Sequence, residues 1–198
     1  MARVARTRED LIEDLNHLDL SYAALLQTPN SEQLNWRPGA EAWSVAQCIQ
    51  HVARVNSVYL PPIKAAIAKR RAVSAVQTLR TSGWFSAYFL KSVSPEGKAK
   101  LPAPRVVRPS AEPSRINVEE ALQTLLGTHQ EIREILNTQS QPDLNRIRFR
   151  NPFIPVLRFT VGTGILIMAA HGRRHLLQAE RVCRMESFPR TQSVSKPA

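Results

Sequence analysis

The sequence has little cysteine and glycine and no long apolar run. Its 198 residues include 2 cysteines, Cys48 and Cys183, with no CxxC pair, so neither a disulfide framework nor a thiolate zinc motif is indicated. Its 7 glycines form no phosphate-binding loop. The longest apolar run, residues 165–170, is too short to cross a bilayer, and no apolar run follows the N-terminal arginines as in a secretory signal. We therefore expect a cytoplasmic protein without a membrane partner.

Acidic residues are scarce relative to basic ones. The chain has 27 Lys and Arg against 16 Asp and Glu, a formal net charge of +11, and such a surface attracts polyanions without any specific motif. Between Lys69 and Arg108, nine basic residues accompany the single acid Glu96. Because the sequence has no helix-turn-helix or RNA-binding signature, we expect a small-molecule substrate and no specific nucleic-acid partner. The sequence leaves a homodimer open.

Four segments repeat apolar residues every three or four positions, which is the period of an amphipathic helix. Thr7, Ser44 and Asn117 are N-cap candidates for three of them, and Pro61 with Pro62 predicts a kink or a break in the second. The pattern predicts an all-α fold, a four-helix bundle. The helices are expected at 7–27, 45–71, 117–138 and about 160–185, in one domain of residues 1–186 followed by a disordered tail at 187–198.

Residues 72–116 show no clear helical period. Prolines at 95, 102, 104, 109 and 113 exclude a continuous helix over the second half, so we interpret this segment as a proline-rich basic insertion between helices two and three. A short helix is predicted from Trp84 to Lys91. We expect its aromatic residues to cover the bundle, with a lid over a binding site as the alternative. These residues are Trp84, Phe85, Tyr88 and Phe89.

Histidines give the clearest indication of a chemical site. His171 and His175 are four residues apart and Gln178 follows three later, so the three side chains share one face of a helix. His51 lies on the inward face of the second predicted helix. Neutral imidazole binds zinc, nickel, copper and iron, and an i, i+4 pair can bind one ion from a single helix turn. The three histidines are therefore a candidate metal site, and hydrogen-bonded core histidines are the alternative.

Four further residues are candidates for supporting roles. His129, inward on the third helix, is a candidate fourth ligand or base, although a hydrogen-bonded core role is more common for such a residue. Gln178 could orient a water molecule or a substrate amide, or simply lie at the mouth of the bundle. Arg174 could hold an anionic substrate at the pocket edge. Cys48, one turn before His51, is a candidate fourth ligand or a small buried apolar residue.

The stretch RPGAEAWSVAQCIQHV (37–52), followed by AAHGRRHLLQAERV (169–182), resembles the DinB-like (DinB/YfiT) superfamily. The resemblance implies a four-helix bundle whose metal ligands are a histidine of the second helix, after a Trp-Ser helix start, and an HxxxH pair of the fourth. In this sequence the ligands implied are His51, His171 and His175. Gln178 matches the family pattern less closely than these three histidines do.

The resemblance also implies one divalent metal ion, most often zinc or nickel, with iron or manganese as alternatives. Characterised members include thiol-dependent S-transferases that use bacillithiol or mycothiol, which makes a low-molecular-weight thiol an expected cosubstrate. We therefore expect a metal-dependent enzyme, of the thiol S-transferase or hydrolase kind, whose ion activates a thiol or water. Two alternatives stay open: a bundle with a purely structural metal, and a basic module that binds nucleic acid or a membrane surface.

Overall fold

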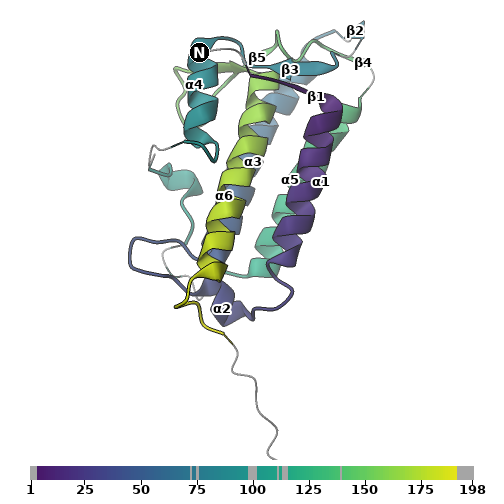
Figure 1. Ribbon diagram of the computed structural model, residues 1–198. Helices are drawn as coiled ribbons and strands as arrows, with labels where there is room; N and C mark the ends of the chain where they lie inside the picture. The colour runs from purple at the N-terminus through teal and green to yellow at the C-terminus, as the bar shows by residue number, and fades with distance from the viewer. Residues whose placement is uncertain are drawn as a thin grey trace, which may run out of the picture.

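The computed structural model describes residues 4–71, 73–74, 76–97, 102–110, 112, 116–138 and 140–190. Within them four long helices run side by side (Figure 1): α1 (Arg8–Ala24), α3 (Val45–Ala68), α5 (Val118–Asn137) and α6 (Val161–Arg184). Packing contacts join α1 to α5, α5 to α3, α3 to α6 and α6 to α1, so the helices form a closed ring around one core. The predicted four-helix bundle is confirmed, with helix ends within a few residues of those expected.

The cap residues expected from the sequence begin these helices. The Thr7 hydroxyl accepts a hydrogen bond from the Asp10 backbone N–H at 3.1 Å, and Ser44 does the same for Gln47 at 3.1 Å. In both cases the side chain of the third helical residue returns a bond to the N–H of the cap residue. The Ser44 capping box fixes where α3 starts, and the start determines which residues of α3 face α6.

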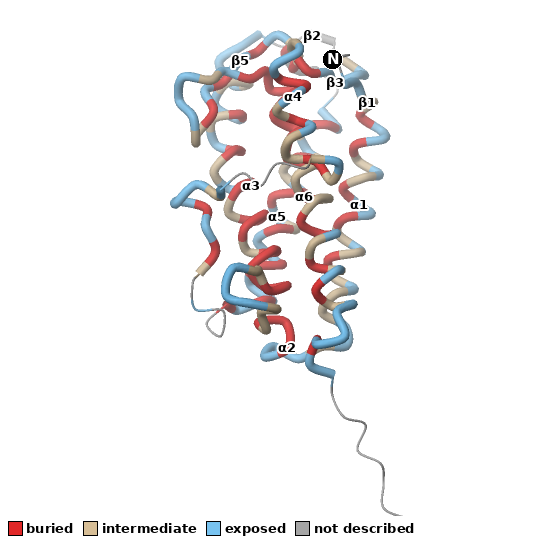
Figure 2. The backbone as a smooth tube through the Cα atoms, turned by 60° about the vertical axis from the view of Figure 1, so that its left-hand side comes forward, coloured by how far each residue is buried: buried red, intermediate tan, exposed pale blue. Residues whose placement is uncertain are grey.

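Apolar side chains fill the space between the helices, and Figure 2 shows buried residues recurring along each of them. From α1 the core receives Leu11, Leu15, Leu18 and Tyr22, each at most 2% exposed. The Tyr22 hydroxyl donates to the Gly172 carbonyl of α6 at 2.7 Å, because a hydroxyl buried without a partner would destabilise the core. This bond ties α1 to the part of α6 that carries the histidines.

The helix α3 runs through Pro61 and Pro62 without a break, which corrects the alternative of a broken helix. Each proline removes one intrahelical N–H, so the carbonyls of Ser57 and Val58 lose their usual partners. Ser57 and Pro61 are exposed, and water can therefore satisfy that side of the helix. The opposite side stays packed through the buried Ile63.

Short strands, which the sequence analysis did not predict, correct the all-α expectation to a mostly helical fold. They form antiparallel pairs of two or three residues at the end of the bundle where α6 begins (Figure 1). Such strands are too short to show a polar–apolar alternation, and two of the pairs join segments far apart in the sequence. The pairs are β1 (Ala5–Thr7) with β3 (Thr78–Arg80), β2 (Val73–Ser74) with β4 (Ser140–Gln141), and β5 (Arg148–Arg150) with β6 (Arg158–Thr160).

The predicted short helix is present as α4 (Trp84–Val93) and packs against α6. Its buried side consists of Ser86, Ala87 and Leu90, while Trp84, Phe85 and Tyr88 are 71%, 41% and 58% exposed. The expectation that the aromatic residues cover the bundle is therefore wrong for these three. The small side chains at 86 and 87 let α4 approach closely, and this orientation turns the bulky rings outward. Of the four aromatic residues, Phe89 alone packs inward, against Phe159 at 5.1 Å between ring centroids.

Two short helices complete the described chain. The first, α2 (Ser31–Asn35), lies between α1 and α3, and η1 (Arg105–Val107) lies between α4 and α5. Near α2 the Phe188 ring packs edge-on against Trp36 at 5.8 Å. Residues 191–198 of the predicted tail, and Lys98 and Lys100 of the basic segment, lie outside the described residues. In the part of the chain that is described, no helix is both long and apolar enough to cross a bilayer.

Candidate metal centre

Three histidines from two neighbouring helices meet in the bundle. His51 comes from α3 and His171 and His175 from α6, and one candidate ligand atom of each lies within 4.8 Å of the other two. His51 and His175 are 4% and 8% exposed. The i, i+4 spacing places the two α6 rings one above the other, with centroids 4.5 Å apart. The structure thus brings together the three residues that the sequence singled out as candidate ligands.

The His51 ring is fixed by a backbone carbonyl from the segment between α4 and α5. Its Nδ1 lies 2.8 Å from the Val107 carbonyl oxygen. Because a carbonyl can only accept, Nδ1 carries the proton and donates it. The Nε2 atom is then the unprotonated nitrogen, with its lone pair available for a metal ion.

The His175 ring is oriented in the same way by a side chain. Its Nδ1 lies 3.0 Å from the amide oxygen of Gln178, so Nδ1–H donates and Nε2 carries the lone pair. That Nε2 atom lies 3.1 Å from Nε2 of His171. Two ring nitrogens this close need a proton or a cation between them, and a cation shared with His51 fits this donor set. The buried Nδ1 of His171 has no hydrogen-bond partner among the described residues.

Burial keeps all three imidazoles neutral. It lowers the pKa of His51 to about 4 and that of His175 to about 3. Burial also lowers the pKa of His171 well below its usual range, with smaller contributions from the neighbouring histidines and from Arg174. At neutral pH the rings are therefore already in the form that binds metals. No cysteine or carboxylate of the described residues joins the group, so an ion held there would keep its full positive charge.

Trp43 forms one wall of the site. Its ring stacks on His175 at 5.5 Å with an interplanar angle of 20°, and meets the edge of His51 at 4.8 Å. Trp43 directly precedes the Ser44 cap, so the capping box that starts α3 also positions this ring. From the sequence alone, the simplest interpretation of Trp43 is that it anchors the loop before α3. Its place just before the cap, eight residues or about two turns before His51, is the signal that could have identified it as a wall.

A segment around η1 covers the site on the α3 side. Four side chains of α3 form hydrogen bonds with the backbone of this segment, at distances of 2.6 to 3.0 Å. Gln47 and Gln50 bond to Ser110, His51 bonds to Val107, and Arg54 bonds to Arg108. Their spacing of i, i+3, i+4 and i+7 places the four side chains on one face of α3. Sequence reasoning missed this contact, because residues 102–110 carry no periodic pattern that would reveal their partner.

Arg174 binds backbone carbonyls at and after the end of α4, while its charge helps to lower the pKa of His171 and His175. Its Nη1 donates to the carbonyls of Ser92, Ser94 and Gly97, at 3.0, 3.1 and 2.9 Å. The Ser92 and Ser94 carbonyls lie at the C-terminal end of α4, where a cation is favourable because the helix dipole is negative there, and the Gly97 carbonyl follows in the next loop. Arg174 therefore anchors the segment between α3 and α5 on the α6 side.

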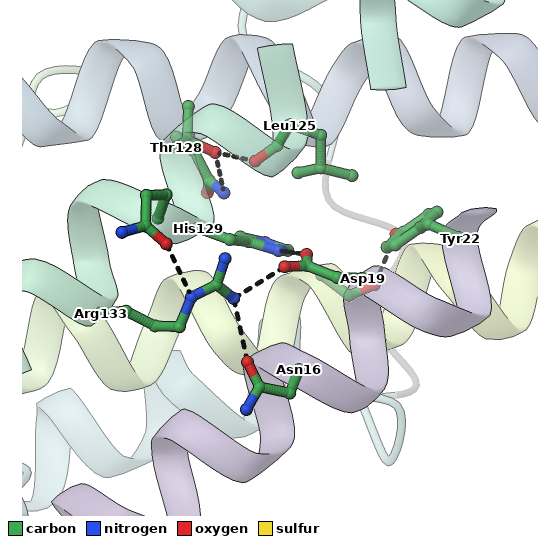
Figure 3. A network of polar contacts seen from close by, with 10 residues as sticks. Asn16, Asp19, Tyr22, Leu125, Thr128, His129 and Arg133 are labelled. Atoms are coloured by element: carbon green, nitrogen blue, oxygen red, sulfur yellow. Dashed lines mark hydrogen bonds and ion pairs between the residues drawn. The ribbon is translucent and has the colours of Figure 1, made fainter. Parts of the chain in front are cut away.

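His129 lies outside the three-histidine group, and so does Cys48. His129 is fully buried, and its Nδ1 donates to Asp19 Oδ1 of α1 at 2.5 Å. Figure 3 shows Asp19 between His129 and Arg133, with Asn16 beside the guanidinium group. Cys48 is 0% exposed, and burial raises the pKa of its thiol above the usual range, as expected for a small apolar core residue.

Comparisons with known proteins agree with this arrangement. A family model described as the DinB superfamily matches residues 21–179. Among solved structures, the chain is similar to YfiT from Bacillus subtilis, described as "a probable metal-dependent hydrolase with an unusual four-helix bundle topology". The TM-score is 0.55 at 13% sequence identity, over 88% of this chain and 84% of that chain. At this identity the likeness shows the fold alone.

The comparison with curated protein sequences gave no match. The family model nevertheless spans well over half of the residues, and the fold agrees with it. This chain therefore belongs to the DinB superfamily.

Proposed function

We propose that the chain is a metal-dependent enzyme in which His51, His171 and His175 hold one divalent cation. The observation that carries the proposal is the convergence of three neutral imidazoles whose candidate ligand atoms lie within 4.8 Å of one another. Zinc and nickel suit this donor set best, with iron and manganese as alternatives. Three protein ligands leave room for a small-molecule substrate at the ion.

The residues around the histidines prepare them for this role. The Val107 carbonyl and the Gln178 amide oxygen turn the δ N–H groups of His51 and His175 outward, which leaves their ε nitrogens unprotonated. The Trp43 ring keeps water from one face of His175. When bound, the cation would supply Lewis acidity, which lowers the pKa of a water molecule or a thiol that reaches it.

Metal content is the first test of the proposal. The purified protein should contain about one zinc or nickel ion per chain, measured by mass spectrometry of the elements, and His51→Ala should contain almost none. His17→Ala is the matched control, because His17 is exposed on α1, and its metal content should equal that of the wild type. Equal metal content in His51→Ala and the wild type would refute the assignment of the ligands.

Two reaction classes fit this chemistry. Water as nucleophile gives a hydrolase, which is how YfiT is described, and a low-molecular-weight thiol gives an S-transferase, as the resemblance to the superfamily implies. The metal-loaded protein should therefore cleave an aryl ester or transfer a thiol to an aryl halide, and His175→Ala should do neither. A protein that binds the ion, loses much of its stability without it and catalyses neither reaction would have a structural metal instead.

A further inference from the structure

A polar pocket lies at the end of the bundle that the short strands cover (Figure 1). It has a volume of about 290 Å³ and is lined by Arg80, Thr81, Ser82, Asn145, Arg146, Arg148 and Thr160. The α6 helix begins beside it at Thr160. His171 lies eleven residues further along α6, which corresponds to about 16 Å at 1.5 Å per residue. The pocket is therefore separate from the three-histidine group.

Three arginines and no acidic residue line this pocket. In the described part of the chain, the only ion pair found for these arginines is between Arg146 and Asp143, at 3.4 Å with Arg146 88% exposed. An ion pair so exposed contributes little. All three arginines are exposed, so the repulsion between them is weak as well, but their shared hollow offers an anion several charged donors at once.

The walls of the pocket are held by a defined set of hydrogen bonds. The Asn145 amide oxygen accepts from the Arg80 backbone N–H at 2.9 Å, and its NH₂ group donates to the Thr78 carbonyl at 2.9 Å. These bonds join the loop before β5 to β3. Beneath the arginines lie the buried threonines Thr81 and Thr160, 0% and 2% exposed. The backbone of the pocket is thus preformed, while the arginine side chains extend from it at exposed positions.

The first N–H groups of α6 are not the source of this site. The Val161 and Gly162 N–H groups donate to the carbonyls of Ile147 and Leu144, at 2.9 and 2.8 Å, and Thr163 N–H donates to the Thr160 hydroxyl. Ligand recognition therefore falls to the side chains. Guanidinium groups match the oxygen geometry of phosphate and bind it through paired, charge-assisted hydrogen bonds.

We propose that Arg80, Arg146 and Arg148 form a binding site for a phosphate group, separate from the metal centre. The group can belong to a free phosphorylated small molecule or to a phospholipid headgroup, since both present the same oxygens. The site requires no metal, so its test is independent of the proposed enzymatic activity.

The first experiment measures the affinity for inorganic pyrophosphate by calorimetry. We expect saturable binding of one pyrophosphate per chain, weakened at least about tenfold by Arg80→Gln and by Arg148→Gln, because each removes a charge-assisted hydrogen bond. Arg184→Gln, an equal loss of charge at the far end of α6, should change the affinity less than about twofold. His175→Ala should bind as the wild type does, which excludes binding of pyrophosphate at the metal.

Two further arms distinguish the source of the phosphate. Saturation by pyrophosphate in solution identifies a free ligand. Binding only to vesicles that contain phosphatidic acid, lost in Arg148→Gln and absent with phosphatidylcholine alone, identifies a headgroup. The proposal is overturned if neither probe binds, if Arg184→Gln weakens binding as much as the pocket variants do, or if a single-stranded oligonucleotide binds without competition from pyrophosphate. Unfolding temperatures of the variants equal to that of the wild type show that lost binding is not lost folding.

Discussion

The bundle contains two polar groups built around inward-facing histidines, one with three rings and one with the single ring of His129, and they differ in what surrounds these rings. His51, His171 and His175 meet between α3 and α6, with no carboxylate among the described residues of the group. His129 instead donates to one oxygen of Asp19, while Arg133 donates to the other at 2.7 Å. One group is a set of neutral rings facing each other, and the other is part of a charged network between α1 and α5.

This difference indicates which buried histidines are suited to bind a metal. The Asp19 carboxylate fixes the His129 ring and joins α5 to α1, and no other histidine, cysteine or carboxylate of the described residues forms a metal-binding group with His129. The three-histidine group is fixed by neutral oxygens, the Val107 carbonyl and the Gln178 amide, at the ring atoms that point away from the shared centre. The convergence of ring nitrogens within 4.8 Å, rather than burial or the partner of each ring, therefore distinguishes the candidate ligands from His129, because a metal ligand can also donate its other N–H to a carboxylate.

Removing a ring from each group should separate the two roles most strongly. His171→Ala should weaken zinc binding more than about 100-fold, because residues that only orient a ligand already contribute about 10- to 100-fold. His129→Ala should destabilise the fold and leave zinc affinity unchanged. Competition with a fluorescent chelator measures both affinities. Equal losses of zinc affinity in His171→Ala and His129→Ala would mean that the two groups do not differ as proposed.

Acid should affect the three-histidine group in the metal-free protein. Burial lowers the pKa of His51 to about 4, whereas the unfolded chain has a histidine pKa of about 6.5. The folded protein therefore binds fewer protons than the unfolded one between these values, so the stabilisation is complete above pH 6.5 and is lost as the pH falls toward 4.

For His51 alone the free energy of unfolding should fall by about 2 kcal/mol between pH 7 and pH 5. Urea unfolding of the chelator-treated protein measures this change. His51→Phe, which retains an aromatic ring without a titratable group, should show a smaller fall. An equal pH dependence in the variant and the wild type would contradict the role given to burial.

Breaking the Asp19 network tests the other side of the comparison. Asp19→Ala leaves the buried His129 and the partly buried Arg133 without their carboxylate, and should lower the free energy of unfolding by about 2 to 4 kcal/mol. Glu13→Ala, at an exposed position of the same helix, should change it by less than about 0.5 kcal/mol. Urea unfolding compares them, with zinc affinity measured in parallel. A loss of zinc affinity in Asp19→Ala would show that the two groups are coupled.

The sequence was sufficient to predict the elements that depend on local pattern. The apolar period and the caps Thr7, Ser44 and Asn117 predicted the long helices, because these signals act within one or two turns. The strands were missed because two- and three-residue pairings depend on segments that meet only in the fold. The predicted orientation of α4 was wrong because it too depends on a partner far away in the sequence. The face of α4 with the small side chains of Ser86 and Ala87 packs on α6, because it allows a closer approach than the aromatic face.

Only those parts of the candidate site could be predicted whose residues lie on a predicted helix face or in a recognisable motif. The pair His171 and His175 is evident from spacing, the inward position of His51 on the second predicted helix made it the third candidate, and the resemblance implied the same three residues. The hydrogen bonds that orient the rings could not be predicted from the sequence. Val107 lies in a segment without periodicity, so no local signal identifies its carbonyl as the partner of a ring 56 residues earlier. The helical wheel directed Arg174 toward the pocket edge, but it could not reveal the backbone carbonyls at and after the end of α4 that Arg174 binds.

The smallest expected effect concerns the side chain that orients His175. Gln178→Ala removes the acceptor of the Nδ1 proton, so the ring loses its fixed tautomer and zinc affinity should fall about tenfold. Gln178→Glu keeps an acceptor and adds negative charge, which makes the ring a stronger donor to the metal, and should restore or increase the affinity. Chelator competition ranks the three proteins. If alanine and glutamate weaken zinc binding equally, Gln178 does not act through the His175 ring, and its hydrogen bond would be as incidental to metal binding as the bond between Asp19 and His129.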